Sequence, residues 1–379
     1  MATKKKQHYV PRFYLKNFSW EDRNTINIFN IKGLKNISNG NLYNQCYGNN
    51  FYGKDIKVED ALGLIEGATA SIINQILTTK SIPGFASEEH CTLIAFVVFQ
   101  HSRTKYAAIK FNQMADRFAK LVLRHEGSVD KSVLDKVTIS FNNAPHLLVG
   151  SAGEMIPLVY DLRCKLIVNK SMYNFITSDN PVVLYNQYMH QSKYGSALGL
   201  ASEGLQIFLP LTSKVMLLFY DSNVYRVGSS ASQICEIYSK PEVIKLNELQ
   251  WLNALENIYY SKTMPGDEID RQASRLVPLR SGELISLDEI NLASSNPDQK
   301  KLLFHSQEPR INVLLKPSFI KIKRIKARIL CNSRAVNVRD PYLVEMYKKF
   351  QEEVKSKRYK PSQFLEYVIN NLGGKCSAL

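Results

Sequence analysis

The chain has 379 residues, of which 45% are hydrophobic and 22% charged, and this composition indicates a soluble globular protein and excludes a disordered chain. Lysine and arginine outnumber aspartate and glutamate by 49 to 34, giving a formal net charge of +15 that attracts polyanions. The longest apolar run, residues 93–99, is too short to cross a bilayer, and the opening MATKKKQH lacks the apolar core of a signal peptide. We therefore expect a cytoplasmic protein without membrane contact.

The cysteines are scattered along the chain, without a close pair or a cysteine–histidine spacing typical of zinc ligands. We therefore expect reduced thiols and no structural zinc. The six are Cys46, Cys91, Cys164, Cys235, Cys331 and Cys376.

The N-terminal part is predicted to begin with an extended arm and to continue into helices. Residues 25–32 alternate in polarity as a strand does, and residues 33–53 are rich in asparagine and glycine, typical of a loop or a short hairpin. Residues 57–79 carry apolar side chains at helical spacing, which predicts an amphipathic helix.

Further helices are expected before the middle of the chain. Ser87 is a good N-cap, and the periodic pattern from residue 93 to Gly127 predicts one long helix or two helices joined by a bend. Residues 128–140 and 144–160 also have helical patterns.

The character of the sequence changes near Asp161, where short β-branched and aromatic runs separated by turn residues predict a mainly antiparallel sheet. A helix is expected over residues 243–260 and a loop-rich stretch over residues 264–309. The C-terminal part should contain strands over residues 311–315 and 322–330 and a closing helical pair over residues 342–371.

These elements predict an α+β fold with a helical N-terminal half, a mainly antiparallel sheet in the middle and a basic α/β C-terminal segment. We divide the chain into an arm and helical region (1–160), a central sheet with a closing helix packed on it as one core (161–262), a loop-rich linker (263–310) and the basic segment (311–379).

The first candidate site is the arm QHYVPRFYLKNF, residues 7–18. His8 can act as an acid, a base or a ligand, and Arg12 can hold a phosphate or an oxyanion. Pro11 favours an extended conformation before it, so that the arm should present His8 at a fixed place. The alternative is that the aromatic residues anchor the arm in a core and that His8 is bonded to a backbone carbonyl.

The second candidate is FITSDNPVVLY, residues 175–185, in which a strand ends at Ser178, Asp179 and Asn180. A carboxylate at a strand end can act in catalysis or bind a metal such as Mg²⁺ or Mn²⁺. Asp-Asn-Pro is equally typical of a structural turn, in which Asp179 accepts hydrogen bonds from nearby backbone amides.

The third candidate is QHSRT on the helix after Ser87, where Gln100 and Arg103 share a face. Polar residues inside a buried helix need partners, and an ion pair between Arg103 and Asp179 would supply one. Such a pair would be structural as readily as catalytic.

The fourth candidate is KIKRIKAR, residues 321–328, with Lys321, Lys323 and Arg324. Residues 321–360 hold thirteen basic side chains against four acidic ones, which favours contact with the phosphate backbone of RNA or DNA. The alternative is an edge strand kept soluble by its lysines.

Four motifs together resemble a known family. They are QHYVPRFYLKNF, QHSRT, FITSDNPVV and LPLTSKVML, followed by NELQWLNALENIYYSK. In combination they resemble a bacterial family of domains of unknown function, family forty-two thirty-eight, over residues 7–262. The resemblance implies no established reaction, substrate or cofactor, but it favours the interpretation that the arm, the Gln100–Arg103 pair and the Ser178–Asn180 turn form one unit.

The leading hypothesis is a phosphodiester-cleaving enzyme, a nuclease acting in a bacterial stress or phage-defence system. His8 would be the general acid or base, Asp179 a metal ligand or the residue that orients His8, and Arg12 and Arg103 would stabilise the developing charge. Gln100, Ser178, Asn180 and the basic segment would hold the substrate. The alternatives are a non-catalytic module that binds nucleic acid or protein, and a hydrolase of a small anionic metabolite.

Overall fold

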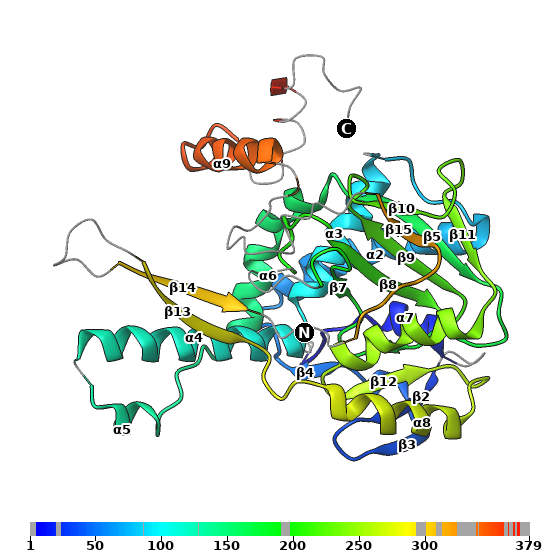
Figure 1. Ribbon diagram of the computed structural model, residues 1–379, viewed down its shortest axis with the longest axis horizontal. Coiled ribbons are helices and arrows are strands. Elements are labelled where there is room, and N and C mark those ends of the chain that lie inside the picture. Colours follow the sequence, from blue (N-terminus) through cyan, green and yellow to red (C-terminus); the bar gives the residue numbers. More distant parts are fainter. Residues whose placement is uncertain are drawn as a thin grey trace.

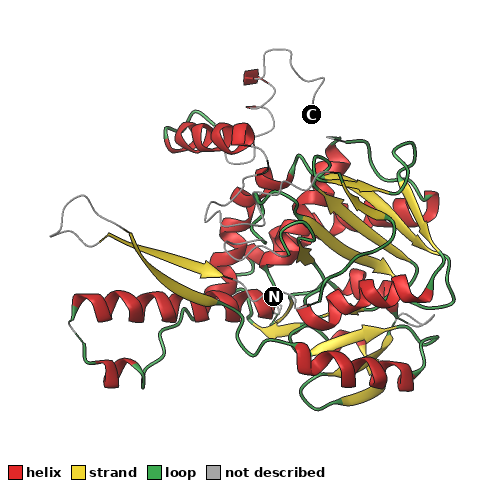
Figure 2. Cartoon of the chain, viewed as in Figure 1, coloured by secondary structure: helices red, strands yellow, loops and turns green. Residues whose placement is uncertain are grey.

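The computed structural model describes residues 5–19, 24–85, 87–127, 129–190, 198–292, 301–307, 313–323, 339 and 341–359, and the single positions 363, 367, 370 and 371. Helices and strands are intermingled throughout the body of the molecule (Figure 2). The ribbon of β13 (Ser286–Leu292) and β14 (Lys301–Gln307) projects from this body beside α4 (Lys105–Glu126), and α9 (Pro341–Lys355) lies above it (Figure 1).

A five-stranded sheet forms the centre of the described chain (Figure 1). Its strands pair antiparallel except β11, which runs parallel to β5. Their order is β11 (Ile234–Ile237), β5 (Arg163–Asn169), β9 (Val215–Tyr220), β8 (Gln206–Thr212) and β7 (Val183–Tyr185).

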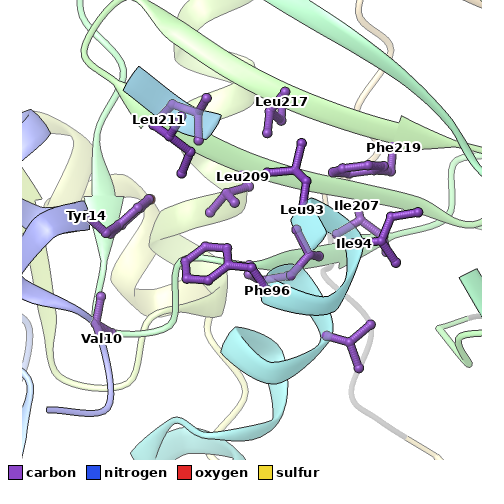
Figure 3. Packing of buried hydrophobic residues seen from close by; sticks show 14 of the residues in the cluster. Val10, Tyr14, Leu93, Ile94, Phe96, Ile207, Leu209, Leu211, Leu217 and Phe219 are labelled. Carbon is purple, nitrogen blue, oxygen red and sulfur yellow. The ribbon is translucent and has the colours of Figure 1, made fainter. Parts of the chain in front are cut away.

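This sheet is buried on both faces, which explains why its strands are almost continuously hydrophobic in sequence. Alternate residues of β9 enter two different cores: Leu217 and Phe219 enter the first, and Leu218 and Tyr220 the second. In the first core, side chains of α3 and of the N-terminal arm pack on the sheet, among them Phe96 (Figure 3).

Helices cover the two faces of the sheet. The first core contains residues of α2 (Lys57–Thr79), α3 (Glu88–Ser102) and α6 (Ala144–Met155). The second core contains residues of α7 (Lys240–Asn253) and α8 (Gly266–Leu276). Since α7 also packs on β6 of the smaller sheet, it joins the two sheets.

The smaller sheet is antiparallel and has the order β3 (Lys35–Asn41), β2 (Thr25–Asn30), β12 (Asn257–Tyr260) and β6 (Thr177–Ser178). Residues 179–182 carry the chain from β6 in this sheet to β7 in the larger one. The Asp-Asn-Pro turn therefore crosses between the two sheets.

Two short ribbons and several short helices complete the described elements. The ribbons pair β1 (Lys6–His8) with β4 (Tyr47–Asn49) and β10 (Tyr225–Val227) with β15 (Ile320–Ile322). The short helices are α1 (Arg12–Leu15), α5 (Lys131–Leu134) and the 3₁₀ turns η1 (Lys16–Phe18), η2 (Leu42–Asn44), η3 (Ile156–Val159) and η4 (Val277–Leu279).

The α+β class is confirmed, and so are several elements. α2 has the predicted bounds, Ser87 caps α3 by accepting a hydrogen bond from the His90 amide, and Gly127 ends α4 with a φ of +65°. The long apolar pattern is two helices, because Thr104 has an extended backbone and caps α4. Residues 33–53, predicted as a loop or a short hairpin, contain β3, η2 and β4, but these strands do not pair with each other: β3 forms a hairpin with the preceding β2, and β4 pairs with β1.

The predicted segregation into a helical half and a sheet is wrong, because β1 to β4 lie in the N-terminal part and pair with elements from both halves. The helix expected over residues 243–260 ends at Asn253, and NIYY forms the strand β12. The stretch 264–309 carries α8, η4 and the β13–β14 ribbon. The predicted helix 128–140 is reduced to the single turn α5.

In the C-terminal part, residues 313–315 of the first predicted strand are not in a strand, and β15 reaches only the first residue of the second. α9 forms the first of the two closing helices. Most of the strand predicted over residues 322–330 lies outside the described residues. None of the helices in the described part of the chain has the length and apolarity to span a membrane.

Candidate functional site at the N-terminal arm

The N-terminal arm is fixed along β4. Lys6 lies opposite Asn49 and His8 opposite Tyr47, and the Tyr9 amide donates to the Cys46 carbonyl at 2.8 Å. β1 ends at His8, and Pro11, with an extended backbone, precedes α1. The arm is therefore extended and held in place before its first helical turn, in agreement with the extended backbone predicted from Pro11.

The buried side of the arm is bonded to the end of α3. Gln100 donates from Nε2 to the Tyr9 carbonyl at 3.0 Å, and Arg103 donates from Nε to the same oxygen at 3.2 Å. The guanidinium of Arg103 also pairs with Glu66 of α2 at 2.7 Å, and its side chain is only 2% exposed. The predicted ion pair of Arg103 with Asp179 is thus wrong: the partner comes from α2, which lies beside α3.

The turn after β6 is bonded to the N-cap of α4 and to α7. Thr104 and Asn180 share a buried hydrogen bond of 3.1 Å, and Asn180 exchanges two side-chain-to-backbone hydrogen bonds with Asn253. Ser178 donates from Oγ to Oε1 of Gln250 at 2.8 Å. The predicted substrate-binding residues Ser178 and Asn180 are at most 1% exposed and have these protein partners.

The carboxylate of Asp179 is occupied by backbone amides. It is 1% exposed and accepts hydrogen bonds from the amides of Leu255, Glu256 and Asn257 at 2.8, 2.7 and 3.2 Å. These bonds hold the segment that leads from α7 into β12. Asp179 and His8 share no hydrogen-bond partner, and the described residues contain no group of three or more side chains that could hold a metal ion.

Burial raises the pKa of Asp179 to about 6, although the three amide bonds oppose the shift. Between about pH 4 and pH 6 the folded protein therefore holds a proton that the unfolded chain has released, so this group's contribution to stability falls as pH rises, by up to about 3 kcal/mol. We expect the free energy of unfolding of the wild type, minus that of Asp179→Asn, to decrease from pH 4 to pH 7. Urea unfolding at each pH measures it.

The Asp267→Asn variant on α8 is the matched control, since it removes a carboxylate that is 76% exposed and so separates the loss of a charge from the loss of a buried carboxylate. A difference for Asp179→Asn that increases with pH would contradict the dominance of burial over the amide bonds.

The solvent side of the arm carries a group of cations and tyrosine rings that we call the arm patch: Lys6, His8, Arg12, Tyr43 and Tyr47. The Lys6 ammonium lies 4.6 Å from the centroid of Tyr43 and 4.5 Å from that of Tyr47, and the Arg12 guanidinium lies 4.8 Å from the Tyr43 ring. Tyr43 is 45% exposed. Within the described residues, neither Lys6 nor Arg12 has a carboxylate partner, so the positive charge of the patch is not compensated.

His8 is half-buried at the edge of the arm patch, with its ring centroid 5.8 Å from that of Tyr43. Its Nε2 lies 3.1 Å from the Tyr43 carbonyl, which can only accept, so Nε2 carries the proton. Burial lowers the pKa of His8, Arg12 lowers it further, and the bond to Tyr43 opposes the shift. The imidazole is therefore neutral at pH 7 and leaves Nδ1 as an acceptor.

The basic segment is described as far as Lys323, and Arg324 lies outside the described residues. Lys321 is exposed on β15 directly opposite the exposed Arg226 of β10, and Lys323 donates from Nζ to the Ser222 carbonyl at 2.6 Å. Like charges placed directly opposite in a ribbon repel one another. Within the described residues neither side chain has a carboxylate partner, so this pair forms a second basic surface.

The structure thus brings the motif residues together in one hydrogen-bonded unit. The predicted catalytic residues, however, do not share one site. His8 and Arg12 belong to the arm patch at the surface, whereas Arg103 and Asp179 are buried and bonded to other protein groups. Sequence reasoning missed the two tyrosines of the patch. Their spacing of four residues in the polar stretch NLYNQCYGNN is a signal that could have identified them, since exposed aromatic residues among asparagines have no core to fill.

A family model described as a protein of unknown function, DUF4238, matches residues 6–264. The matched region runs from β1 to the residues just after β12, so it contains the arm, the arm patch and the buried network, and it confirms the resemblance inferred from the motifs. No curated protein and no solved structure matches the chain.

Proposed function

We infer that the arm patch of this chain, which belongs to the DUF4238 family, binds single-stranded nucleic acid. The observation that carries this proposal is the position of Lys6 and Arg12 against the rings of Tyr43 and Tyr47, without a carboxylate partner among the described residues. Unpaired bases stack on exposed aromatic rings, and the phosphates between them bind adjacent cations. The net charge of +15 favours association with such a polyanion.

The buried network supports this proposal by fixing the arm. Gln100 and Arg103 both donate hydrogen bonds to the Tyr9 carbonyl, one residue after His8. The side chain of Gln7 accepts a hydrogen bond from the Tyr52 amide at 2.7 Å. A binding surface gains affinity when its side chains are carried by backbone that does not have to be ordered on binding. The polar motifs of the family then serve to position the patch, and their burial is consistent with that role.

Phosphodiester cleavage is the second candidate, and the neutral imidazole of His8 beside Arg12 favours it. In this account Nδ1 of His8 takes the proton of the attacking hydroxyl as its oxygen bonds to phosphorus, and Arg12 stabilises the phosphorane-like charge. The P–O5′ bond then breaks to leave a 2′,3′-cyclic phosphate, and the departing 5′-oxygen takes a proton from the imidazolium or from water. The buried Arg103 and Asp179 take no part, because their polar atoms are bonded to Glu66, Tyr9 and the amides that precede β12. The attacking hydroxyl in this reaction is the ribose 2′-OH, so RNA would be cleaved and DNA would only be bound.

The proposal is tested by fluorescence anisotropy with labelled oligouridylate and oligothymidylate over a range of salt concentrations. Tyr43→Ala should weaken binding by about 5- to 150-fold, because base stacking on an aromatic ring contributes about 1–3 kcal/mol. Lys6→Ala combined with Arg12→Ala should reduce the slope of log K against log salt by about 1.4, from two lost phosphate contacts. Incubating the same oligonucleotides with magnesium, with manganese and with EDTA tests for cleavage.

The matched control is Tyr238→Ala, which removes a tyrosine that is 69% exposed on another part of the surface and should leave the affinity unchanged. If Tyr43→Ala and the double variant bind as the wild type does, the arm patch is not the binding surface. Cleavage of RNA that His8→Ala abolishes would establish the second candidate. Binding without cleavage would leave the protein as a non-catalytic module.

A further inference from the structure

A cavity of about 370 Å³ opens at the end of the five-stranded sheet, away from the residues of the arm patch. It lies between the beginning of β5, the segment that leads into α3, and the loop of residues 228–233 between β10 and β11. This volume is within the range of small-molecule sites in proteins.

Two cations line this cavity. The guanidinium of Arg163 lies 3.8 Å from the ring centroid of Phe85 and has no carboxylate partner among the described residues. The ammonium of Lys165, a residue only 6% exposed, donates to the carbonyls of Ser229 and Ser232. An ammonium has three donors, and the third has no protein acceptor in the described part of the chain.

None of the residues that line the cavity carries a carboxylate. Burial lowers the pKa of Lys165, as is expected for an ammonium without a carboxylate beside it. Burial and Arg163 together lower the pKa of His90 to about 4, so this imidazole is neutral at pH 7 and does not add to the charge. The lining thus holds two cationic side chains and no anionic one, which suits a phosphate dianion.

One part of the lining is apolar and aromatic. Ile82, Pro83, Phe85 and Tyr220 contribute flat or apolar surface, and the imidazole of His90 lies with its centroid 5.3 Å from that of Phe85. An inorganic phosphate would use only the charged end of such a cavity. A ligand that fills it combines a phosphate with a planar, weakly polar group.

We propose that this cavity binds a phosphomonoester that carries a planar ring, such as a nucleoside monophosphate, with its phosphate on Arg163 and Lys165 and its ring against Phe85 and Tyr220. Arginine binds phosphate through two parallel hydrogen bonds, and a stacked guanidinium is already oriented for this contact. The serine-rich loop 228–233 supplies hydroxyl and amide donors at the mouth of the cavity. The proposal is independent of the arm patch, with which the cavity shares no residue.

Isothermal titration of the full chain with AMP, GMP, CMP and UMP tests the proposal, with adenosine and inorganic phosphate as partial ligands. At least one nucleotide should bind, and it should bind at least about 10-fold more tightly than either partial ligand. Arg163→Gln should weaken that binding by about 10- to 100-fold, as expected for the loss of charge-assisted hydrogen bonds. A parallel measurement of the melting temperature should show stabilisation by the nucleotide in the wild type and little in the variant.

Arg271→Gln on α8, whose side chain is 68% exposed, is the matched control and should bind as the wild type does. Ala231→Trp at the exposed mouth is the second variant, since it blocks entry without removing a buried contact. The proposal is overturned if none of the four nucleotides binds, or if Arg163→Gln and Ala231→Trp both bind the nucleotide as tightly as the wild type. Neither variant should alter oligonucleotide binding. Failure of the nucleotide-site proposal is therefore distinguishable from failure of the proposal for the arm patch.

Discussion

Replacing Arg103 by methionine is expected to lower the free energy of unfolding by about 3–5 kcal/mol, the usual cost of breaking a buried ion pair from one side. The guanidinium is 2% exposed and joins three parts of the fold, because it binds Glu66 of α2 and the Tyr9 carbonyl of the arm from the end of α3. Methionine fills similar volume but leaves these acceptors without their donor. Chemical denaturation followed by circular dichroism measures the loss.

A double-mutant cycle of Arg103→Met and Glu66→Gln separates the free energy of the ion pair from that of the hydrogen bonds to the arm. Glu66→Gln keeps an acceptor oxygen and is 28% exposed, so it should cost less than Arg103→Met. Arg117→Met on α4 is the matched control, because its ion pair with Glu283 is exposed at the surface and should contribute less than about 1 kcal/mol. A loss of under about 1 kcal/mol for Arg103→Met would show that the buried network does not hold the arm.

Replacing Arg339 by methionine is the other change with a large expected effect, again about 3–5 kcal/mol. Its guanidinium forms a two-bond ion pair with Asp161, at 2.5 and 2.9 Å, and also donates to the carbonyls of Leu158 and Ser202. The Arg339 side chain is 2% exposed. Since Arg339 lies just before α9 and beyond the region matched by the family, it fastens the C-terminal segment to the family core.

Hydrogen exchange followed by mass spectrometry localises this effect. In the Arg339→Met protein the amides of α9 should exchange about 100-fold faster, because the local free energy of opening falls by at least about 3 kcal/mol. Arg358→Met, which removes an exposed pair with Glu353, is the control and should leave α9 as protected as in the wild type. Unchanged exchange in α9 would mean that its packing on Leu158 and Tyr160 alone holds the segment.

Local patterns were sufficient to predict elements whose stability is local. α2 follows from its apolar periodicity, and the caps at Ser87 and Gly127 mark real helix ends because the capping interactions involve neighbouring residues. Four strands of the five-stranded sheet, β5, β7, β8 and β9, were found because burial on both faces makes them nearly continuously apolar, whereas β11, which carries the exposed Glu236, was not predicted.

Elements that depend on distant partners were missed. Residues 257–260 continue the helical pattern of α7, but Asp179 binds the amides of Leu255, Glu256 and Asn257 and so directs this segment into β12. Similarly, α8 buries Ile269 and Leu276 in the second core, while its charged residues give its sequence the appearance of a loop. Neither the role of Asp179 in directing β12 nor the packing of α8 on the second core can be identified from the local sequence.

The same distinction applies to the candidate site. The motifs indicated that the arm, QHSRT and the Asp-Asn-Pro turn form one unit, and the hydrogen bonds of Gln100 and Thr104 connect them. The sequence could not show that Glu66 would pair with Arg103, nor that Tyr43 and Tyr47 would lie beside Lys6, because both depend on how α2 and β4 pack on the arm.

Photo-crosslinking tests the location of the nucleic-acid site directly. An oligouridylate that contains 4-thiouridine is bound to the full chain, irradiated and digested with trypsin, and the crosslinked peptides are identified by mass spectrometry. We predict crosslinks on the peptide of residues 36–54, which carries Tyr43 and Tyr47 between the cleavage sites at Lys35 and Lys54, and their loss in Tyr43→Ala combined with Tyr47→Ala. Crosslinks that avoid this peptide and persist in the double variant would contradict the proposed binding surface.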